Sequence, residues 1–455
     1  MNTTTSPPFG LALIEFFEKL KQQHINFCVL GGYSGLPETI TASDVDIIFS
    51  RKQLSKVATT LKSVFQTNGF TYCSVHIFKG RHTYIFYFQG DDNIISASLK
   101  IDLFVNFEFR GRNFLSSVDI LKACRPYKNF FIPSLAHKIF MVLIKGIMKG
   151  GTSWKKYLPK IQDGLQNHTP EIEVLLSSFF KAPTVNFLIS NLSKGRVDKI
   201  DAMRKSLILE TYTQSLFKYP IRFIFNLIGH YGIAGGRILR PPRYMVALLG
   251  PDGVGKSTMI NHIKSDLIDI LKVDFDKSKS FHIRPKLFPT ITQIFKSKGI
   301  SDEKPTRSYK AWQSSSPFIS FCRLFFFWVD YVLGYIIKIL PELNNYNVVI
   351  LDRYYYDILI DPSRYKINLP YRILKAFYFL LPRPEVVFFL KAPPETIRQR
   401  KQELTIPQIQ RLLKKYKNLT SEFNNVCIMD ASMSPDKISK EIVSIFLKRV
   451  AYKLQ

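Results

Sequence analysis

The segment from Gly250 to Ser257, "GPDGVGKS", combines residue types that can bind a polyphosphate. Glycines let backbone N–H groups turn toward an anion, and a helix starting here would present its positive end to it. Lys256 is expected to reach the β- and γ-phosphates of ATP, and Ser257 to supply a hydroxyl to Mg²⁺. The predicted cofactor-binding residues of this segment are Gly250, Asp252, Gly253, Gly255, Lys256, Ser257 and Thr258.

Charged side chains follow two later apolar runs that read as strands. Asp352 ends the run "NVVILD" and can hold Mg²⁺ directly or through water. Arg353 comes next, and its planar guanidinium can clamp a phosphate or carboxylate of an acceptor. Beyond the run "EVVFFLK", Arg398, Arg400 and Lys401 form a cluster that, on a mobile lid, would neutralise charge on a transferring phosphoryl group. The alternative for this cluster is a solvated basic helix face.

A second candidate site lies near the start of the chain, where an eleven-residue spacer separates Gly31 and Gly32 from Asp44 and Asp46. Carboxylates at i and i+2 of a strand point to the same face, which is how a protein presents paired oxygens to one or two Mg²⁺ ions. Asp102, in the apolar run "SLKIDLFVNF", is placed to complete the set. The paired glycines let the backbone approach a triphosphate. The alternative is a solvated aspartate pair in a loop at a strand end.

The elements that must position these residues follow from the hydrophobic pattern. Residues 9–24 and 52–67 have helical patterns, and the runs between 26 and 107 are mostly β-rich. The pattern then turns helical from about 115 to 232, and 235–243 reads as a linker. Further on, nearly continuous apolar strands alternate with helices, which is typical of a parallel sheet buried on both faces. We therefore predict an α/β protein with an α+β domain at 1–115, a helical extension and linker at 116–243, and an α/β domain with a parallel sheet at 244–455.

Residues 244–455 resemble the thymidylate-kinase family of P-loop kinases. "GPDGVGKST" is similar to that family's phosphate loop, "DRYYYD" to its Asp-Arg-Tyr motif, and "APPETIRQRK" to the entry of its lid. The resemblance implies a P-loop kinase domain in which Asp252 faces the acceptor, while Lys256, Arg353 and the lid cations serve phosphoryl transfer. The pattern as a whole looks most like the members that accompany surface-polysaccharide biosynthesis, so thymidylate is not assumed to be the acceptor.

The acceptor region is where the chain departs from that family. Leu249 stands where the family usually has Glu, and "SFHIRPKLFPTI" replaces a Gly/Pro-rich segment. Arg323 and Asp330, seven residues apart, share one helical face, and an Arg in this region of the family helps to hold the acceptor. The alternative for this pair is a buried ion pair or a helix cap. The candidate acceptor contacts are Asp252, Arg284, Arg323, Asp330 and Arg364.

Residues 9–150 resemble the minimal nucleotidyltransferase fold, in which a Gly-Gly or Gly-Ser pair and a spacer of this length precede an Asp-x-Asp motif. The helical run that contains "PSLAHKIFMVLIKGIMK" looks like the usual helical extension of that fold. The resemblance implies that Asp44, Asp46 and Asp102 are catalytic metal ligands. A family member can keep the fold and lose the activity, so nucleotidyl transfer and mere nucleotide binding both stay open.

Charge and hydropathy limit the class of protein. The chain has 64 Lys and Arg against 35 Asp and Glu, a formal net charge of +29. This favours anionic partners, namely nucleotides, nucleic acid, acidic polysaccharide or anionic lipid, or it reflects a Lys-, Phe- and Ile-rich composition with no special partner. The five separated cysteines fit a reducing cytosol without a structural zinc, and the N-terminus has no secretory-signal pattern.

Two apolar stretches bear on membrane contact. Residues 318–340 are interrupted by Arg323, Asp330 and Lys338, and we expect a buried helix of a soluble domain. Residues 216–233 mix cations with large apolar residues; we expect a helix packed between domains, with peripheral membrane contact as the alternative.

Together these features predict a cytoplasmic enzyme that uses ATP and Mg²⁺ to phosphorylate a nucleoside monophosphate, a sugar or a glycolipid precursor. Two other functions stay open. One is a nucleotide-operated switch or scaffold in surface-polysaccharide assembly, and the other is a nucleic-acid-modifying nucleotidyltransferase. Arg353 and the lid cations favour transfer chemistry over a switch, which needs neither.

Overall fold

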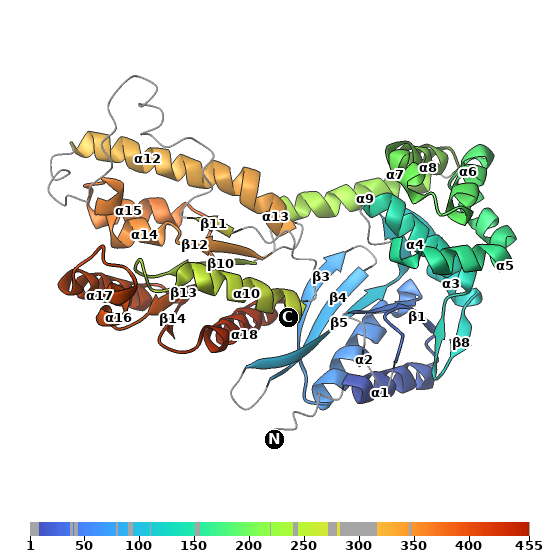
Figure 1. The fold of residues 1–455 in the computed structure, drawn as a ribbon, viewed down its shortest axis with the longest axis horizontal. Helices are drawn as coiled ribbons and strands as arrows, with labels where there is room; N and C mark the ends of the chain where they lie inside the picture. The colour runs from blue at the N-terminus through green and yellow to red at the C-terminus, as the bar shows by residue number, and fades with distance from the viewer. Residues whose placement is uncertain are drawn as a thin grey trace. The chain divides into compact units, whose positions relative to one another are not determined.

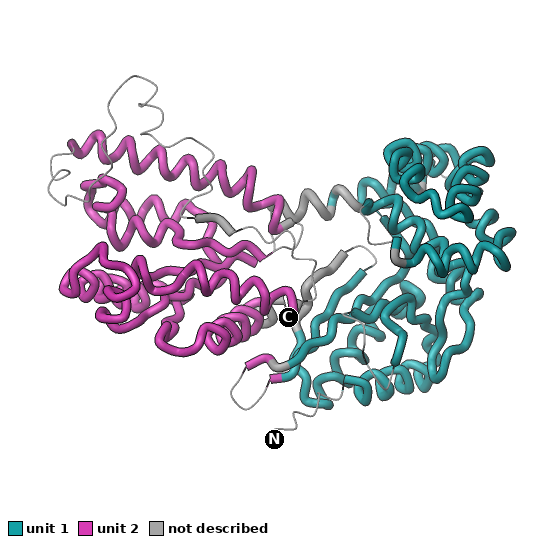
Figure 2. Tube along the Cα trace, viewed as in Figure 1, with its two compact units in different colours: residues 1–88, 97–236 teal, residues 89–96, 237–455 magenta. Residues whose placement is uncertain are grey.

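The computed structural model divides the chain into two compact units (Figure 2). Unit 1 consists of residues 1–88 and 97–236, and unit 2 of residues 89–96 and 237–455. Both combine helices with sheets that contain parallel strands, so the mixed α/β class is confirmed (Figure 1). The residues that the structure describes are 9–36, 40, 44–78, 81–89, 94–109, 111–150, 155–218, 220–239, 244–271, 280–282, 316–344 and 348–454.

Unit 1 is built on a five-stranded mixed sheet with the order β1-β2-β5-β4-β3. The strands are β1 (Phe27–Gly31), β2 (Asp44–Phe49), β3 (Thr71–Phe78), β4 (Arg81–Gln89) and β5 (Ile95–Phe104). β2 pairs antiparallel with β1 and parallel with β5, and β3 pairs antiparallel with β4. All five strands lie in runs that the sequence predicts as β-rich. Helices α1 (Phe9–Gln22) and α2 (Leu54–Thr67) confirm the two predicted N-terminal helices.

The two faces of this sheet have separate cores because side chains alternate along each strand. Val45, Ile47 and Phe49 of β2 belong to the core that contains α1 and α2. Ile48, of the opposite parity, belongs to a second core formed with the helices that follow the sheet. Asp44 and Asp46 share the parity of Ile48, so they lie on the face that these later helices cover.

The helices after the sheet complete unit 1. They are α3 (Ser117–Lys122), α4 (Leu135–Lys149), α5 (Leu158–Ser177), α6 (Ala182–Ser193), α7 (Val197–Ala202), α8 (Arg204–Lys218) and α9 (Pro220–Leu239). Two short ribbons, β6 (Asn106–Phe109) with β7 (Arg112–Ser116) and β8 (Arg125–Tyr127) with β9 (Phe130–Ile132), and the turns η1 (Arg51–Gln53) and η2 (Lys155–Tyr157) join these elements. Phe140, Ile144 and Leu188 pack in the same core as Cys28 and Leu30 of β1. The predicted helical extension therefore shares a core with the sheet rather than standing apart as a connector.

Unit 2 contains a five-stranded sheet with the order β11-β12-β10-β13-β14, and all its strand pairs are parallel. The strands are β10 (Met245–Leu249), β11 (Ser280–His282), β12 (Val349–Asp352), β13 (Val386–Lys391) and β14 (Val426–Asp430). β10, β12 and β13 confirm the three predicted strands and are buried along almost their whole length. β11 and β14, at the two edges, are strands that the sequence reasoning missed.

Helices cover this sheet, and α10 packs beside α18 (Figure 1). The helices and turns of unit 2 are α10 (Lys256–Leu271), α12 (Pro317–Gly334), η3 (Tyr335–Ile339), α13 (Leu340–Asn344), α14 (Tyr356–Ile360), η4 (Pro362–Tyr365), α15 (Tyr371–Phe379), α16 (Pro394–Arg400), α17 (Ile406–Glu422) and α18 (Pro435–Leu454). Because the sheet is parallel, the carboxyl ends of β10, β12 and β13 lie at one edge, and the loops that follow these strands meet there.

The apolar stretch at 318–340 is helical, but it is buried on one face only. Leu324, Asp330 and Tyr331 are buried, whereas Phe318 and Ile337 are more than half exposed. In the described part of the chain, Pro317–Leu343 is the one helical segment long and apolar enough to span a membrane, and a third of its most apolar window is buried. The expectation of a buried helix thus holds for only one side of it.

Candidate functional site

The glycine loop of unit 2, residues 250–255, joins the carboxyl end of β10 to the start of α10. Gly250, Gly253 and Gly255 have φ of 151°, 92° and 102°, a region that residues with a side chain rarely adopt. A Cβ on Gly250 would lie 2.9 Å from the carbonyl oxygen of Leu390, and one on Gly253 would lie 2.8 Å from Cβ of Lys401. All three glycines are therefore needed for the path of the loop. A loop that leads into a helix N-terminus in this way can bind an anion through backbone N–H groups.

Lys256, the first residue of α10, turns back over this loop. Its Nζ donates to the carbonyl oxygens of Gly250 at 3.0 Å and Pro251 at 2.8 Å, and the residue is 6% exposed. Burial lowers the pKa of Lys256 to about 8, and the nearby guanidinium of Arg353 acts in the same direction. Ser257, next in the chain, is exposed on the first turn of the helix, as is Thr258. A buried cation with exposed hydroxyls beside it can receive a phosphate and a hydrated metal.

The carboxyl end of β12 lies directly beside the loop. Asp352 is in register with Leu248 of β10, one residue before that strand ends, and is mostly buried. Arg353 continues this contact, because its backbone N–H donates to the carbonyl of Leu248 at 2.8 Å. Arg353 is 1% exposed and has a φ of 66°, so its backbone is in the left-handed region. The sequence placed Asp352 and Arg353 beside the loop, and the structure brings them there.

Two carboxylates and two guanidiniums form a closed ring next to the glycine loop. Arg353 donates from Nη2 to Asp252 Oδ1 and from Nη1 to Asp357 Oδ1, the latter at 2.6 Å. Arg364 Nη2 donates to Asp252 Oδ2 at 3.1 Å, and its Nη1 lies 3.8 Å from Asp357 Oδ2. Burial alone would raise the pKa of Asp252, but Arg353 and Arg364 outweigh it and hold the pKa well below its usual range. We call these four residues the charge ring.

The three predicted lid cations separate in the structure. Arg400 Nη1 lies 3.5 Å from the carbonyl oxygen of Val254, in the glycine loop. Lys401 also lies at the loop, since its Cβ would be 2.8 Å from a Cβ on Gly253, and its Nζ pairs with Glu403 at 3.1 Å. Arg398 instead donates to the carbonyls of Gln402 and Leu404 between α16 and α17.

The candidate acceptor contacts are only partly brought together. Arg364 joins the charge ring with Asp252, as described above. Arg323 donates to the carbonyl oxygen of Lys366 at 2.9 Å, two residues beyond Arg364. Asp330 is fully buried in α12, whereas Arg323 on the same helix is half-buried. Arg284 lies outside the described residues.

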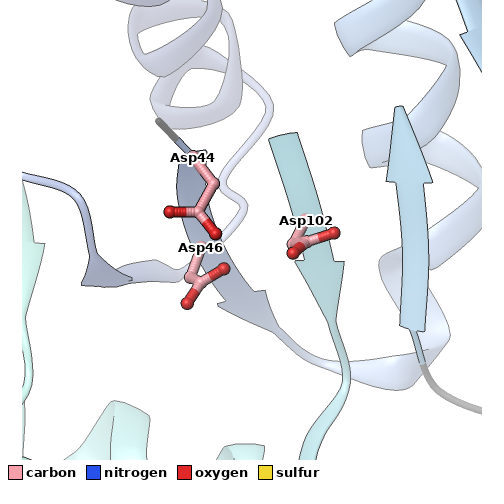
Figure 3. Close-up of side chains that lie close together, drawn as sticks. All are labelled: Asp44, Asp46 and Asp102. Carbon is pink, nitrogen blue, oxygen red and sulfur yellow. The ribbon is translucent and has the colours of Figure 1, made fainter. Parts of the chain in front are cut away.

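Unit 1 brings its three predicted carboxylates together. Asp46 of β2 is in register with Asp102 of β5, and Asp44 lies two residues before Asp46 on the same face. One oxygen from each of the three lies within 4.8 Å of the others (Figure 3). Gly31, at the end of β1, packs closely here: a Cβ at this position would lie 3.3 Å from Asp46 Oδ2. Gly32 has a φ of 73° and turns the chain away from the strand.

Cations that the sequence reasoning did not single out surround this acidic triad. Lys100 Nζ lies 3.6 Å from Asp44 Oδ2 and 3.5 Å from Asp102 Oδ2, and Arg81 Nη2 lies 2.6 Å from Asp102 Oδ2. Burial would raise the pKa of Asp102, but Arg81 and Lys100 outweigh it and lower the pKa. Lys100 could have been found from the sequence, since it stands two residues before Asp102 and therefore on the same face of β5.

Two more residues that contact the acidic triad come from elements distant in the chain. Lys145 of α4 lies 3.7 Å from Asp46 Oδ2, and the hydroxyl of Thr83 of β4 donates to Asp102 Oδ1. Burial raises the pKa of Asp46 above its ordinary value, although Lys145 opposes the shift. These partners depend on tertiary packing, for which the sequence carries no local signal.

The acidic triad suits a hard divalent cation. Mg²⁺ binds carboxylate oxygens and keeps several waters, and three converging carboxylates from two adjacent strands provide that donor set. The ammonium group of Lys100 now balances two of these carboxylates, and a metal ion would take over that charge. When bound, such an ion would supply Lewis-acid activation of a phosphate. Asp44, Asp46 and Asp102 would hold it, while Arg81 and Thr83 fix the orientation of Asp102.

The charge ring of unit 2 contains one residue to which the sequence reasoning gave no role. Asp357 ends the motif "DRYYYD" and is 2% exposed. It accepts hydrogen bonds from Tyr365 at 2.7 Å and from Tyr416 at 3.1 Å. Arg353 precedes the short helix α14 (Tyr356–Ile360) and has a left-handed backbone, so the helical i,i+4 rule could not have predicted its contact with Asp357.

The comparisons with known proteins add nothing to this geometry. No protein-family model matches the chain, and no curated protein matches it significantly.

Proposed function

We propose that unit 2 is a thymidylate-kinase-like P-loop domain, of the type associated with surface-polysaccharide biosynthesis, that transfers a phosphoryl group from Mg·ATP to a small acceptor. The observation that carries the proposal is Lys256, buried over a loop of three positive-φ glycines beside Asp352 and Arg353. A bound polyphosphate would replace the carbonyls of Gly250 and Pro251 as the partner of Lys256. The acceptor would be a nucleoside monophosphate, a sugar or a glycolipid precursor.

The charges around the loop favour transfer over a nucleotide-operated switch. Arg353, Arg364 and Arg400 converge on the loop from three different segments. Arginines in such positions neutralise the charge that develops on a transferring phosphoryl group and its acceptor. A switch that only binds and releases nucleotide has no need of them.

We further propose that the acidic triad of unit 1 is a nucleotidyltransferase-like site. The observation that favours it is the approach of Asp44, Asp46 and Asp102 to within 4.8 Å of one another beside Gly31. Phosphoryl transfer by unit 2 and nucleotidyl transfer by unit 1 would both use nucleoside triphosphates and Mg²⁺. We place the enzyme in the cytoplasm, where these are abundant, with peripheral contact to a membrane if the acceptor is lipid-linked.

One set of assays tests both proposals on the full chain. ATP labelled at the γ-phosphate is incubated with Mg²⁺ and a panel of nucleoside monophosphates, hexoses and lipid-linked sugars. ATP labelled at the α-phosphate reports nucleotidyl transfer. Lys256→Ala should abolish transfer of the γ-label and leave the α-label unaffected, whereas Asp46→Asn should do the reverse. Undiminished acceptor-dependent turnover of ATP in Lys256→Ala would refute the kinase.

Other outcomes identify the alternatives. If the protein binds ATP but hydrolyses or transfers none with any acceptor of the panel, and ATP alters its affinity for a partner, the switch or scaffold is indicated. Salt-sensitive binding of DNA or RNA, with transfer of the α-label to it, would point to a nucleic-acid-modifying enzyme.

A further inference from the structure

We infer that Asp357 is a positioning residue of the site in unit 2: it holds Arg353 and Arg364 in place against the glycine loop, and it acts on phosphoryl transfer through them. This inference rests on the proposed kinase function. It deepens that proposal by naming the group on which the orientation of both arginines depends.

The carboxylate of Asp357 is enclosed by groups from three segments. Its Oδ1 accepts from Arg353 Nη1 at 2.6 Å and from the Tyr416 hydroxyl at 3.1 Å. Its Oδ2 accepts from the Tyr365 hydroxyl at 2.7 Å and lies 3.8 Å from Arg364 Nη1. At 2% exposed it cannot itself reach a nucleotide or an acceptor, so any effect on transfer must pass through the arginines.

Asp357 fixes the plane of the Arg353 guanidinium. One end of this planar group is held by Asp357 and the other by Asp252, so the two carboxylates together define both its position and its tilt. Without the charge on Asp357, Arg353 retains Asp252, on the glycine loop, as its carboxylate partner. That partner lies where a polyphosphate would bind, and so it is the one that binding would disturb.

The backbone of Arg353 is held independently of Asp357. Its N–H donates to the carbonyl of Leu248 in β10, which pins the residue to the parallel sheet. Loss of the carboxylate should therefore release the side chain and leave the strand in place. A variant that loses this carboxylate should therefore fold normally and still react more slowly. A displacement of about 1 Å in a charged group can lower a rate by about a hundredfold.

Tyr416 shows how closely the position of Asp357 is controlled. Its ring stacks on Phe389 of β13 at a centroid distance of 4.7 Å, so its hydroxyl reaches Asp357 from a rigid support on the central sheet. Tyr365, on η4, adds a second hydroxyl next to Arg364 in the chain. Asp357 thereby ties the segment that carries Arg364 to the one that carries Arg353.

The test is a kinetic comparison of full-length Asp357→Asn, Asp357→Glu and Tyr416→Phe with wild type. ADP release from Mg·ATP is measured with each member of the panel of nucleoside monophosphates, hexoses and lipid-linked sugars, and binding of Mg·ATP is measured by calorimetry. Tyr356→Phe is the matched control, since it removes a buried hydroxyl from the same helix, where it pairs with Tyr378 at 2.6 Å outside the charge ring.

We expect Asp357→Asn to lower kcat by about a hundredfold while KM for ATP changes less than about threefold, the pattern of a contact made in the transition state. Asp357→Glu should recover part of the loss, and Tyr416→Phe should lower kcat by less than tenfold, roughly one hydrogen bond's worth. Tyr356→Phe should match wild type.

Wild-type kcat in Asp357→Asn would overturn this inference alone, as would equal losses in the Tyr416→Phe and Tyr356→Phe variants. If Asp357→Asn does not fold, the Glu variant and Tyr416→Phe decide the question by the same criteria. A wild-type chain that releases no ADP with any member of the panel would overturn the proposed kinase, and this inference with it.

Discussion

Replacing Asp252 with Asn should lower the free energy of unfolding of unit 2 by about 2 kcal/mol at neutral pH. The Asp252 carboxylate accepts a hydrogen bond from Arg353 and another from Arg364 at 3.1 Å, and it lies 3.9 Å from Lys256 Nζ. Breaking a buried ion pair from one side costs about 3–5 kcal/mol, and an exposed pair contributes about 0–1 kcal/mol. The Asp252 side chain is 18% exposed and Arg353 keeps Asp357 as a partner, so the expected cost lies between these limits.

The pH dependence of this difference has a definite sign. The folded-state pKa of Asp252 is depressed because Arg353 and Arg364 outweigh the effect of burial. A depressed pKa contributes stability that is complete above the unfolded-state pKa, close to 3.8, and that is lost as the pH falls toward the folded-state value. The difference between wild type and Asp252→Asn should therefore be constant from about pH 7 to about pH 5 and shrink below about pH 4.

The assay must report on unit 2 alone, because a chain of two units does not unfold in a single two-state step. Urea titrations followed by hydrogen exchange of peptides from residues 349–365 satisfy this condition. Asp269→Asn, an exposed charge removal on α10, is the matched control and should cost less than about 0.5 kcal/mol. Equal midpoints for the Asp252 and Asp269 variants, or a difference that widens below about pH 4, would refute the reasoning.

Two further predictions concern the acidic triad and the glycine loop. Lys100→Met removes the ammonium group that lies 3.5 and 3.6 Å from two triad carboxylates, so the full chain should bind Mn²⁺ roughly tenfold more tightly. Calorimetry measures this affinity, and weaker binding would argue against a metal role for the triad. Gly253→Ala introduces a Cβ at a φ of 92° and 2.8 Å from Cβ of Lys401, so unit 2 should lose about 1–2 kcal/mol of stability in the same exchange assay. Gly255→Ala, in the same loop at a φ of 102° and with its new Cβ no closer than 3.8 Å to Arg400 Nη1, is the control for backbone strain without a clash.

The hydrophobic pattern predicts the central strands of both sheets but not their edges. β10, β12 and β13 are apolar runs because helices cover both faces of a parallel sheet, and this composition is visible in the sequence. β11 has three residues, and β14 is buried at only one of its five positions. A short or half-exposed edge strand lacks the continuous apolar run, so it is recognisable only once its neighbour is in place.

The acidic triad was predictable because it depends on strand periodicity. Asp44 and Asp46 share a face of β2 by the two-residue repeat, and the parallel pairing with β5 brings Asp102 opposite Asp46. The charge ring has no such rule behind it. Arg364 and Tyr416 reach the site from η4 and α17, and in the sequence Tyr416 looks like any aromatic residue on the buried stripe of an amphipathic helix.

The lid cations show how helix geometry limits a prediction made from charge alone. Arg398 and Arg400 stand two residues apart on α16, and on an α-helix such residues point roughly 200° away from each other. Both therefore cannot face the glycine loop at once while α16 remains helical. The structure assigns the loop side to Arg400, which reaches Val254, and the opposite side to Arg398, which caps carbonyls near Leu404. Of these two arginines, only Arg400 could act on a bound phosphate unless α16 unwinds or turns.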